Sequence, residues 1–246
     1  MPPRTKISLI VCVIVGAACV KHNSSPVPTV PPVQDTTVRT PPAGGSGDTL
    51  TYLALGDSYT IGQSVSDYDR YPAQVVRKLR GDGFYYRTPD IIAVTGWTTG
   101  DLLNAMPDTA SHLHYHAVSL LIGVNNQYQF RTQSEYRTQF TELLRQSIHL
   151  ANDSPSHVLV LSIPDYSVTP FARGRNLAYI AAQIDSFNAI NKEVSMSYHT
   201  AWLDVTGESR KAAGDPSLIA SDSLHFSGKE YAIWAEMMEP IMKAMH

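Results

Sequence analysis

The sequence predicts an α/β fold in which a parallel sheet is covered by helices on both faces. Short apolar runs alternate with amphipathic stretches from about residue 50 to the C-terminus. These runs are continuously apolar, which is typical of strands buried on both sides by helices. A chain of 246 residues with 43% hydrophobic content can bury one substantial core. We therefore expect a single folded domain over residues 50–246.

The apolar runs are the predicted strands, and each is followed by a turn or loop. They cover residues 51–55, 91–94, 117–122, 158–162 and 201–205. Ligands of open α/β sheets bind beyond the carboxyl ends of the strands. Ser58, Gly96 and Asn125 all lie in loops that follow these runs.

The amphipathic stretches are the predicted helices. They cover residues 71–80, 99–106, 134–150, 175–196 and 228–245. We expect Ser134 to cap the third helix, because a serine oxygen at that position can accept a free backbone N–H. The fourth helix has an apolar face at a 3.6-residue period, formed by Leu177, Ile180, Ile184, Phe187 and Ile190.

The first residues have the order of an export signal. Positive charge at Arg4 and Lys6 is followed by an apolar stretch over residues 7–15 and then by small residues before Cys19. The apolar stretch is too short to span a bilayer. We therefore expect residues 1–18 to be a signal peptide and the protein to be exported.

Cys19 resembles the acylated cysteine of the bacterial lipoprotein lipobox, although Gly16 stands where that motif usually has leucine. The resemblance implies a lipid anchor that holds the protein in the cell envelope. Signal cleavage after Ala18 without a lipid, which gives a periplasmic or secreted protein, is the alternative. Because Cys12 and Cys19 are the two cysteines of the chain, we expect no disulfide in the folded domain.

Residues 19–49 are predicted to form a tether. Pro, Ser, Thr, Val and Gly dominate this stretch, which ends in Gly44-Gly45-Ser46-Gly47, and such a composition cannot sustain a packed element. The formal charge of the whole chain is −3, and no run of lysine or arginine forms a basic stripe. Nucleic acid is therefore not an expected partner.

Ser58, Asp222 and His225 are placed for nucleophilic catalysis. A serine hydroxyl needs a base to take its proton, and a histidine needs a carboxylate to fix its tautomer. Asp222 and His225 are three residues apart, so one turn can hold both side chains toward Ser58. The chain order is that of the α/β-hydrolases, but their Gly-x-Ser-x-Gly elbow is absent. A different hydrolase family is indicated.

Four sequence blocks resemble those of the GDSL, or SGNH, hydrolase family, whose signature residues are Ser, Gly, Asn and His. The blocks are LGDSYTIG at 55–62, TGWTTG at 95–100, IGVNN at 122–126 and DSLH at 222–225. The resemblance covers essentially the whole folded domain. It implies a flavodoxin-like three-layer α/β/α sandwich with a mostly parallel central sheet.

By this resemblance Ser58 is the nucleophile, His225 the general base and then acid, and Asp222 the partner that orients it. The oxyanion would be held by the backbone N–H groups of Ser58 and Gly96 and by the side-chain amide of Asn125. One such donor can contribute roughly two to three orders of magnitude to turnover. The resemblance implies hydrolysis of carboxylic esters through an acyl-serine intermediate, and this chemistry requires no metal or organic cofactor.

The family usually has aspartate after the oxyanion asparagine, whereas this chain has Asn126. Asparagine accepts hydrogen bonds without carrying charge, so we expect a geometric adjustment of the loop and retained activity. Asp57 is expected to brace the turn before Ser58. Trp97 and Tyr59 flank the predicted site, where they either line an acyl or sugar pocket or pack into the core.

His112, His114 and His116 are the main competing site, because alternate residues of a strand share one face and histidine binds metals such as zinc. No acidic or cysteine partner lies nearby in the sequence. We interpret the three histidines as a solvated strand entrance at the opposite end of the sheet from Ser58, and we predict no metal site.

The natural ester stays open at this point. An acetylated polysaccharide and a lipid or other long-chain acyl ester both fit, whether the substrate is a small molecule or part of a polymer. A non-catalytic module that holds glycan or lipid in its cleft is the alternative from a different class. The presence of all five predicted site residues argues against it.

Overall fold

The computed structural model describes residues 34–35, 49–107 and 113–246. The predicted signal peptide, Cys19 and most of the predicted tether lie outside the described residues, as does His112. Within the described ranges, none of the helices combines the length and apolar character that a membrane span needs.

The centre of the fold is a six-stranded sheet in the order β1-β3-β2-β4-β5-β6. Five of the strands run parallel to one another, as predicted: β2 (Tyr52–Gly56), β3 (Asp90–Val94), β4 (Ala117–Leu121), β5 (Val158–Leu161) and β6 (Ala201–Leu203). The residues of β2, β3, β4 and β5 are all buried. This burial explains why these strands are continuously apolar in the sequence.

The sixth strand corrects one expectation. β1 (Gln34–Asp35) pairs antiparallel with β3 at the edge of the sheet, within the stretch that we predicted to form no packed element. Neither of its two residues is proline, so both keep a backbone N–H for pairing, although prolines stand on either side of them in the sequence. Edge strands tolerate such proline-flanked segments.

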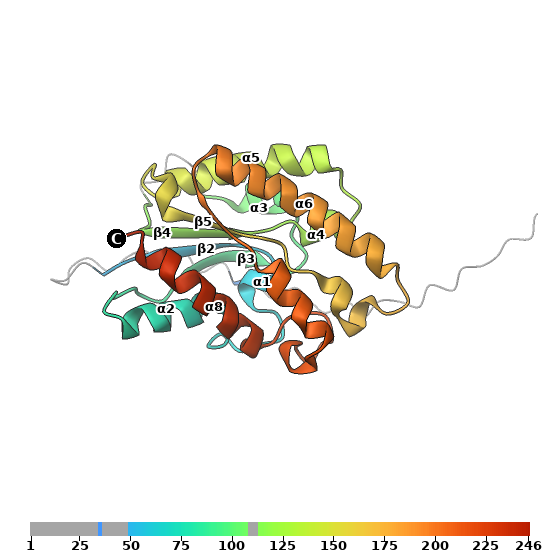
Figure 1. Cartoon of the computed structure of the whole chain (residues 1–246). Coiled ribbons are helices and arrows are strands. Elements are labelled where there is room, and N and C mark those ends of the chain that lie inside the picture. The colour runs from blue at the N-terminus through green and yellow to red at the C-terminus, as the bar shows by residue number, and fades with distance from the viewer. Residues whose placement is uncertain (1–33, 36–48, 108–112) are drawn as a thin grey trace, which may run out of the picture. The chain divides into compact units, whose positions relative to one another are not determined.

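Helices cover both faces of the sheet (Figure 1). α2 (Tyr71–Gly81) and α8 (Gly228–Lys243) pack together on one face. α3 (Thr99–Ala105), α5 (Gln133–Leu150) and α6 (Leu177–Ser197) cover the other. The predicted three-layer α/β/α sandwich is thus confirmed.

Two helix starts differ from the predicted ones. The hydroxyl of Thr132, not that of Ser134, caps α5 by accepting the Glu135 N–H at 3.1 Å. Thr132 has a glutamate three residues later, the spacing of a capping box, and Ser134 does not. α6 begins at Leu177 rather than residue 175, and Leu177 is 46% exposed. The buried face of α6 therefore starts at Ile180.

Two short helices follow strand ends and were not predicted. α1 (Ser58–Ile61) follows β2, and α4 (Val124–Tyr128) follows β4. Helices of about one turn are too short to show a 3.6-residue period. A Cβ atom added to Gly56 would lie 2.1 Å from the Thr60 hydroxyl oxygen, so glycine lets α1 fold back over the end of β2.

The remaining short elements connect the later strands and helices. They are η1 (Pro155–His157), η2 (Tyr166–Val168), η3 (Pro170–Ala172), α7 (Thr206–Ser209), η4 (Arg210–Ala213) and η5 (Pro216–Leu218).

Buried aromatic rings join α8 to the end of β2. The Trp234 ring lies 5.0 Å from Tyr231 and 5.7 Å from Phe226, measured between centroids. Phe226 in turn lies 5.8 Å from Tyr59, which follows Ser58 in α1. Aromatic rings at these centroid distances are in contact, and the large apolar area that they bury stabilises this packing. The segment just before α8 is thereby fixed against α1.

Of the predicted strand-entrance histidines, His114 and His116 lie just before β4, at the opposite end of that strand from Asn125. His116 is half-buried, and its Nδ1 accepts the Thr51 N–H at 3.1 Å. His114 is exposed, with its ring centroid 6.0 Å from that of His149. Over the ranges that the structure describes, no three His, Cys, Asp or Glu side chains are grouped to hold a metal ion.

Candidate active site

Ser58 is the first residue of α1 and is only 4% exposed. Asp57 caps this helix, because its Oδ1 accepts the Tyr59 N–H at 3.0 Å. The brace predicted for Asp57 is therefore present. Burial raises the pKa of Asp57 to about 7, and its Oδ2 has no hydrogen-bond partner among the described residues.

Asp222 and His225 form a closed turn directly before α8. Oδ2 of Asp222 lies 2.6 Å from Nδ1 of His225. The other carboxylate oxygen accepts the N–H groups of Leu224 and His225, each at 2.9 Å. Both carboxylate oxygens thus fix the histidine, one through its ring and one through its backbone. We call residues 220–225 the base loop.

A serine that sequence reasoning missed supports this pair. Ser64, in the loop after α1, donates its hydroxyl to Oδ2 of Asp222 at 2.7 Å. Partial burial alone would raise the pKa of Asp222, but the hydrogen bonds from His225 and Ser64 outweigh burial and hold it well below its ordinary value. No motif marks Ser64, because it lies 158 residues from its partner.

The ring of His225 lies against the helix that begins at Ser58. Its centroid is 5.6 Å from the Tyr59 ring, with the two rings edge to face. His225 is 6% exposed and Ser58 is 4% exposed, so both side chains are largely shielded from water. The Ser58 hydroxyl makes no hydrogen bond to a described residue, which leaves it free to turn. Tyr59 itself is buried and packs into the core.

Gly96 lies in the turn after β3 with a φ of +89°. This backbone conformation favours glycine. A Cβ added there would meet nothing within 4 Å, so the backbone faces open space. Within the described ranges, the N–H groups of Ser58 and Gly96 donate no backbone hydrogen bond. Both remain available to an acceptor that enters this space.

Asn125 joins α4 to the same turn. Its Nδ2 donates to the carbonyl oxygen of Trp97 at 2.9 Å. A side-chain amide carries two hydrogens, so this bond orients the group and leaves the second hydrogen free. Trp97 is half-buried and packs against the core. Asn125 thus links the turn after β3 to the helix after β4.

Asn126 shows how the departure from the usual family aspartate is accommodated. The fully buried amide accepts the Thr99 N–H at 2.9 Å and donates to the Thr99 hydroxyl at 2.7 Å. That hydroxyl donates to Oε1 of Gln139 at 2.5 Å. A carboxylate accepts but does not donate. The asparagine therefore ties α4 to α3 by donating to the Thr99 hydroxyl, which aspartate cannot do, and this leaves the hydroxyl free to donate to Gln139.

An aromatic wall extends from α4 toward the base loop. Tyr128, one turn after Asn125, lies 6.2 Å from both Tyr166 and Phe171 between ring centroids. The Phe171 N–H donates to the carbonyl oxygen of Ser223 in the base loop at 3.0 Å. Sequence reasoning missed this wall, because its residues belong to helices of about one turn, which are too short to show a period.

The model of the GDSL-like lipase/acylhydrolase family matches residues 54–233 of the chain. The chain belongs to this family. It is therefore an ester-hydrolysing enzyme of the SGNH serine hydrolase type. The matched residues contain every block on which the sequence resemblance rested.

Solved structures show the same fold at low sequence identity. TesA is 18% identical with a TM-score of 0.62, and the match covers 80% of this chain and 99% of TesA. Axe2, an acetylxylan esterase from Geobacillus stearothermophilus, is 17% identical with a TM-score of 0.61, covering 80% and 95%.

A third similar structure is the psychrotrophic esterase EstA from a Pseudoalteromonas species, inhibited by monoethylphosphonate. It is 16% identical with a TM-score of 0.60, covering 79% of this chain and 97% of EstA. No curated protein matches the chain significantly.

Proposed function

We propose that the protein is an exported serine esterase that hydrolyses carboxylic esters through an acyl intermediate on Ser58. The observation that supports this most strongly is the 2.6 Å contact between His225 and Asp222, held against the helix that begins at Ser58. A serine, an oriented histidine and a carboxylate are the parts that nucleophilic ester cleavage needs.

In the first half of the reaction, the Ser58 oxygen attacks the ester carbonyl carbon while Nε2 of His225 takes the hydroxyl proton. Asp222 holds the proton on Nδ1 and stabilises the charged ring. The Ser58 hydroxyl turns toward Nε2 when the substrate fills the site, as catalytic hydrogen bonds often form fully only in the substrate complex. Collapse of the tetrahedral intermediate breaks the bond to the alcohol, which leaves with the proton from His225.

In the second half, water attacks the acyl group on Ser58 and gives a proton to Nε2 of His225. The acid is released as the serine oxygen recovers this proton. In both halves the negative charge on the carbonyl oxygen is held by the N–H groups of Ser58 and Gly96 and by the free amide hydrogen of Asn125. Donors fixed in advance in a water-poor site stabilise such charge strongly.

Replacement of the nucleophile tests this proposal. Ser58→Ala should lower kcat for short p-nitrophenyl esters by at least about a thousandfold, because no other group attacks the carbonyl. Ser134→Ala is the matched control, since Ser134 is an exposed serine on α5. Turnover by a folded Ser58→Ala protein at the parental rate would overturn the proposal.

Two ester classes fit this mechanism, and chain length separates them. Axe2 is an acetylxylan esterase by its name, whereas a protein of similar fold from Enterococcus faecalis is called a lipase/acylhydrolase. A rate that falls sharply beyond acetate favours an acetylated carbohydrate as substrate. A rate that rises up to eight carbons or beyond favours a lipid or other long-chain acyl ester.

Export and lipid anchoring rest on residues 1–19. The order of charge, apolar stretch, small residues and Cys19 supports removal of residues 1–18 and acylation of Cys19 in a bacterial envelope. The full chain expressed in a bacterium should fractionate with membranes, and Cys19→Ser should release it. An unchanged distribution of Cys19→Ser would count against the anchor.

A further inference from the structure

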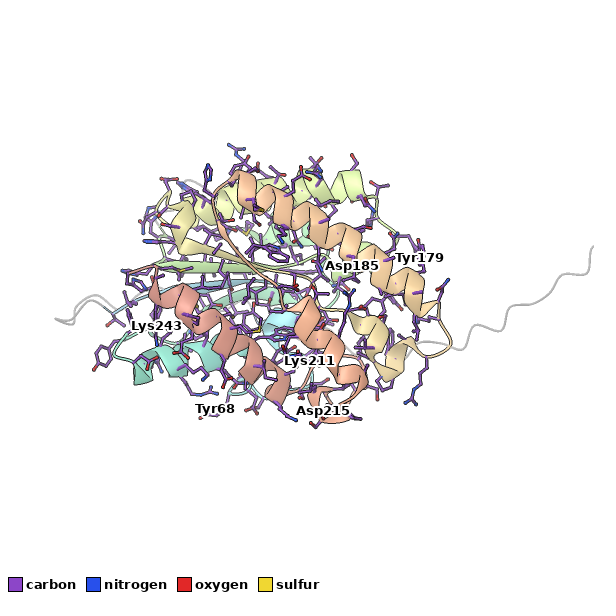
Figure 2. The ribbon with its side chains drawn as sticks, in the orientation of Figure 1. Tyr68, Tyr179, Asp185, Lys211, Asp215 and Lys243 are labelled. Carbon is purple, nitrogen blue, oxygen red and sulfur yellow. The ribbon has the colours of Figure 1, made fainter. Side chains whose placement is uncertain are left out.

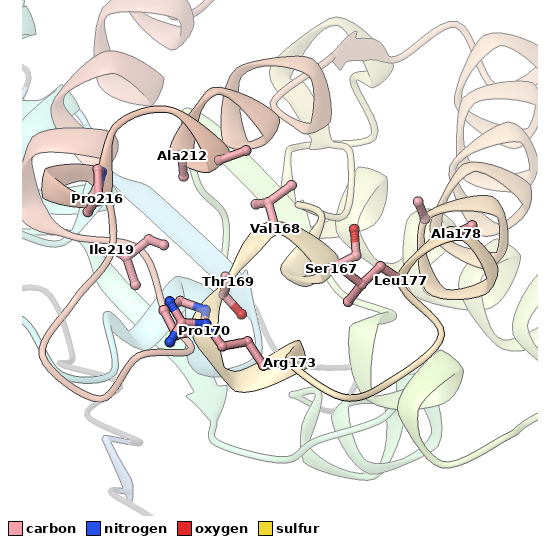
Figure 3. A pocket seen from close by; sticks show the side chains of 12 residues that line it. Ser167, Val168, Thr169, Pro170, Arg173, Leu177, Ala178, Ala212, Pro216 and Ile219 are labelled. Atoms are coloured by element: carbon pink, nitrogen blue, oxygen red, sulfur yellow. The ribbon is translucent and has the colours of Figure 1, made fainter.

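A groove of about 580 Å³ lies beside the base loop and contains none of the proposed catalytic residues. Figure 3 shows Ala212, Pro216 and Ile219 on one side of it and Ser167, Leu177 and Ala178 on the other. This volume is within the range of small-molecule sites in proteins.

The walls of the groove are the segments that hold the base loop. Ile219 forms a single antiparallel bridge with Phe226, and the N–H of the next residue, Ala220, donates to the His225 carbonyl oxygen at 2.8 Å. Across the groove, Pro170 precedes Phe171, whose N–H donates to Ser223. A molecule in the groove would contact both supports of His225.

Arg173 is the single ionisable residue in the lining. Its exposed side chain forms no hydrogen bond or ion pair with any residue in the described part of the chain. In Figure 3 it lies beside Pro170, between the two sides of the groove. Asp215, which precedes the lining residue Pro216, pairs with Lys229 at 2.7 Å.

The rest of the lining is mainly apolar, from Val168, Ile219 and the alanines to Leu177 at the rim. Leu177 is 46% exposed, and Tyr179, which projects from the first turn of α6 in Figure 2, is 49% exposed. The polar groups are few. The Ser167 hydroxyl has no hydrogen-bond partner among the described residues.

We propose that this groove binds a medium-chain fatty acid, with the chain along the apolar walls and the carboxylate on Arg173. One unpaired cation in an apolar groove complements a ligand with one negative charge and a hydrocarbon body. A guanidinium binds a carboxylate through charge-assisted hydrogen bonds. A sugar would need more polar partners than the lining supplies.

A fatty acid bound at this site would influence His225 through the base loop. A chain packed on Ile219 and Pro170 would stabilise the base loop through the two segments that support it. The inference does not depend on Ser58 being the nucleophile, because it concerns binding to the groove alone.

Calorimetric titration with sodium decanoate, below its micelle concentration, tests the site. The parent protein should bind one decanoate, and Arg173→Gln should weaken this affinity about tenfold, the loss of one charged hydrogen-bonding group. Decanol should bind the parent about tenfold more weakly than decanoate for the same reason. Arg145→Gln, which changes an exposed arginine of α5, is the matched control and should leave the affinity unchanged.

Two further arms locate the ligand. Ala181→Trp, which fills the groove from α6, should abolish decanoate binding in a protein of unchanged circular dichroism. A parent protein blocked by a fluorophosphonate at the active site should bind decanoate as before. The proposal fails if decanoate does not bind saturably, if Arg173→Gln binds it as well as the parent, or if blocking the active site removes the binding.

Discussion

Asp57 is the residue beside the nucleophile, and its carboxyl group is buried without solvent contact. One oxygen caps α1, and the other has no partner within the described ranges. Burial raises the pKa of Asp57 from 3.8 to about 7. The folded protein therefore binds this proton more tightly than the unfolded chain does. The stability that results is complete below pH 3.8 and is lost as the pH rises toward 7.

Asp57→Asn should remove this dependence, because the amide has the shape of the protonated acid and does not ionise. The Tm of the variant minus the Tm of the parent should therefore be larger at pH 8 than at pH 4, by on the order of 5 °C. Burial also raises the pKa of Glu230 to about 7. Glu230 is present in both proteins, so its effect on Tm cancels in the comparison. Parallel Tm curves for the two proteins would show that the Asp57 carboxyl is not the titrating group.

Ser64 is a positioning residue that acts on His225 through Asp222. Ser64→Ala should lower kcat about tenfold and leave KM unchanged, since it loosens the carboxylate without touching the substrate. Ser64 has a φ of +67°, which asparagine tolerates, so Ser64→Asn should restore part of kcat through its amide donor. A change confined to KM, or a kcat equal to the parental value, would contradict this role.

At the scale of elements, the site depends on how α3 and α4 are tied together. Asn126 donates to the Thr99 hydroxyl, which is therefore free to donate to Gln139. With a carboxylate at position 126, the Thr99 hydroxyl must turn to donate to it, and the bond to Gln139 is lost.

Asn126→Asp should consequently lower the free energy of unfolding by about 1–2 kcal/mol. In a Gln139→Ala background the same substitution should cost less, because Thr99 no longer has a partner to lose. Urea unfolding of the four proteins of this double-mutant cycle measures the coupling. Strictly additive effects would mean that the three residues do not act as one network.

The elements themselves show what can be predicted from the sequence and what cannot. The buried parallel strands and the long helices α2, α5, α6 and α8 have clear periodicity and were predicted within a few residues. α1 and α4 were not, because one helical turn has no period to detect. The cap of α5 was placed on Ser134 instead of Thr132, because both hydroxyl residues precede the same apolar pattern.

At the scale of the whole molecule, the site unites segments that are far apart in the chain. Ser58, Gly96 and Asn125 lie after β2, β3 and β4, which are neighbours in the sheet, while His225 comes from the segment before α8. The rule of carboxyl strand ends predicted the placement of Ser58, Gly96 and Asn125 after strands, and their joint role in catalysis stays a prediction. Ser64, the aromatic wall and the groove beside the base loop were not predictable, because they arise from contacts between segments far apart in the sequence that no local pattern marks.

The family match shows an ester-hydrolysing enzyme, and the proposed nucleophile is the claim on which the mechanism depends. Treatment of the folded protein with a fluorophosphonate, followed by mass spectrometry of its peptides, tests this claim most directly. The mechanism predicts one phosphonyl adduct per chain, located on Ser58 and absent from Ser58→Ala. An adduct on a different serine, or no adduct on the folded parent protein, would contradict it.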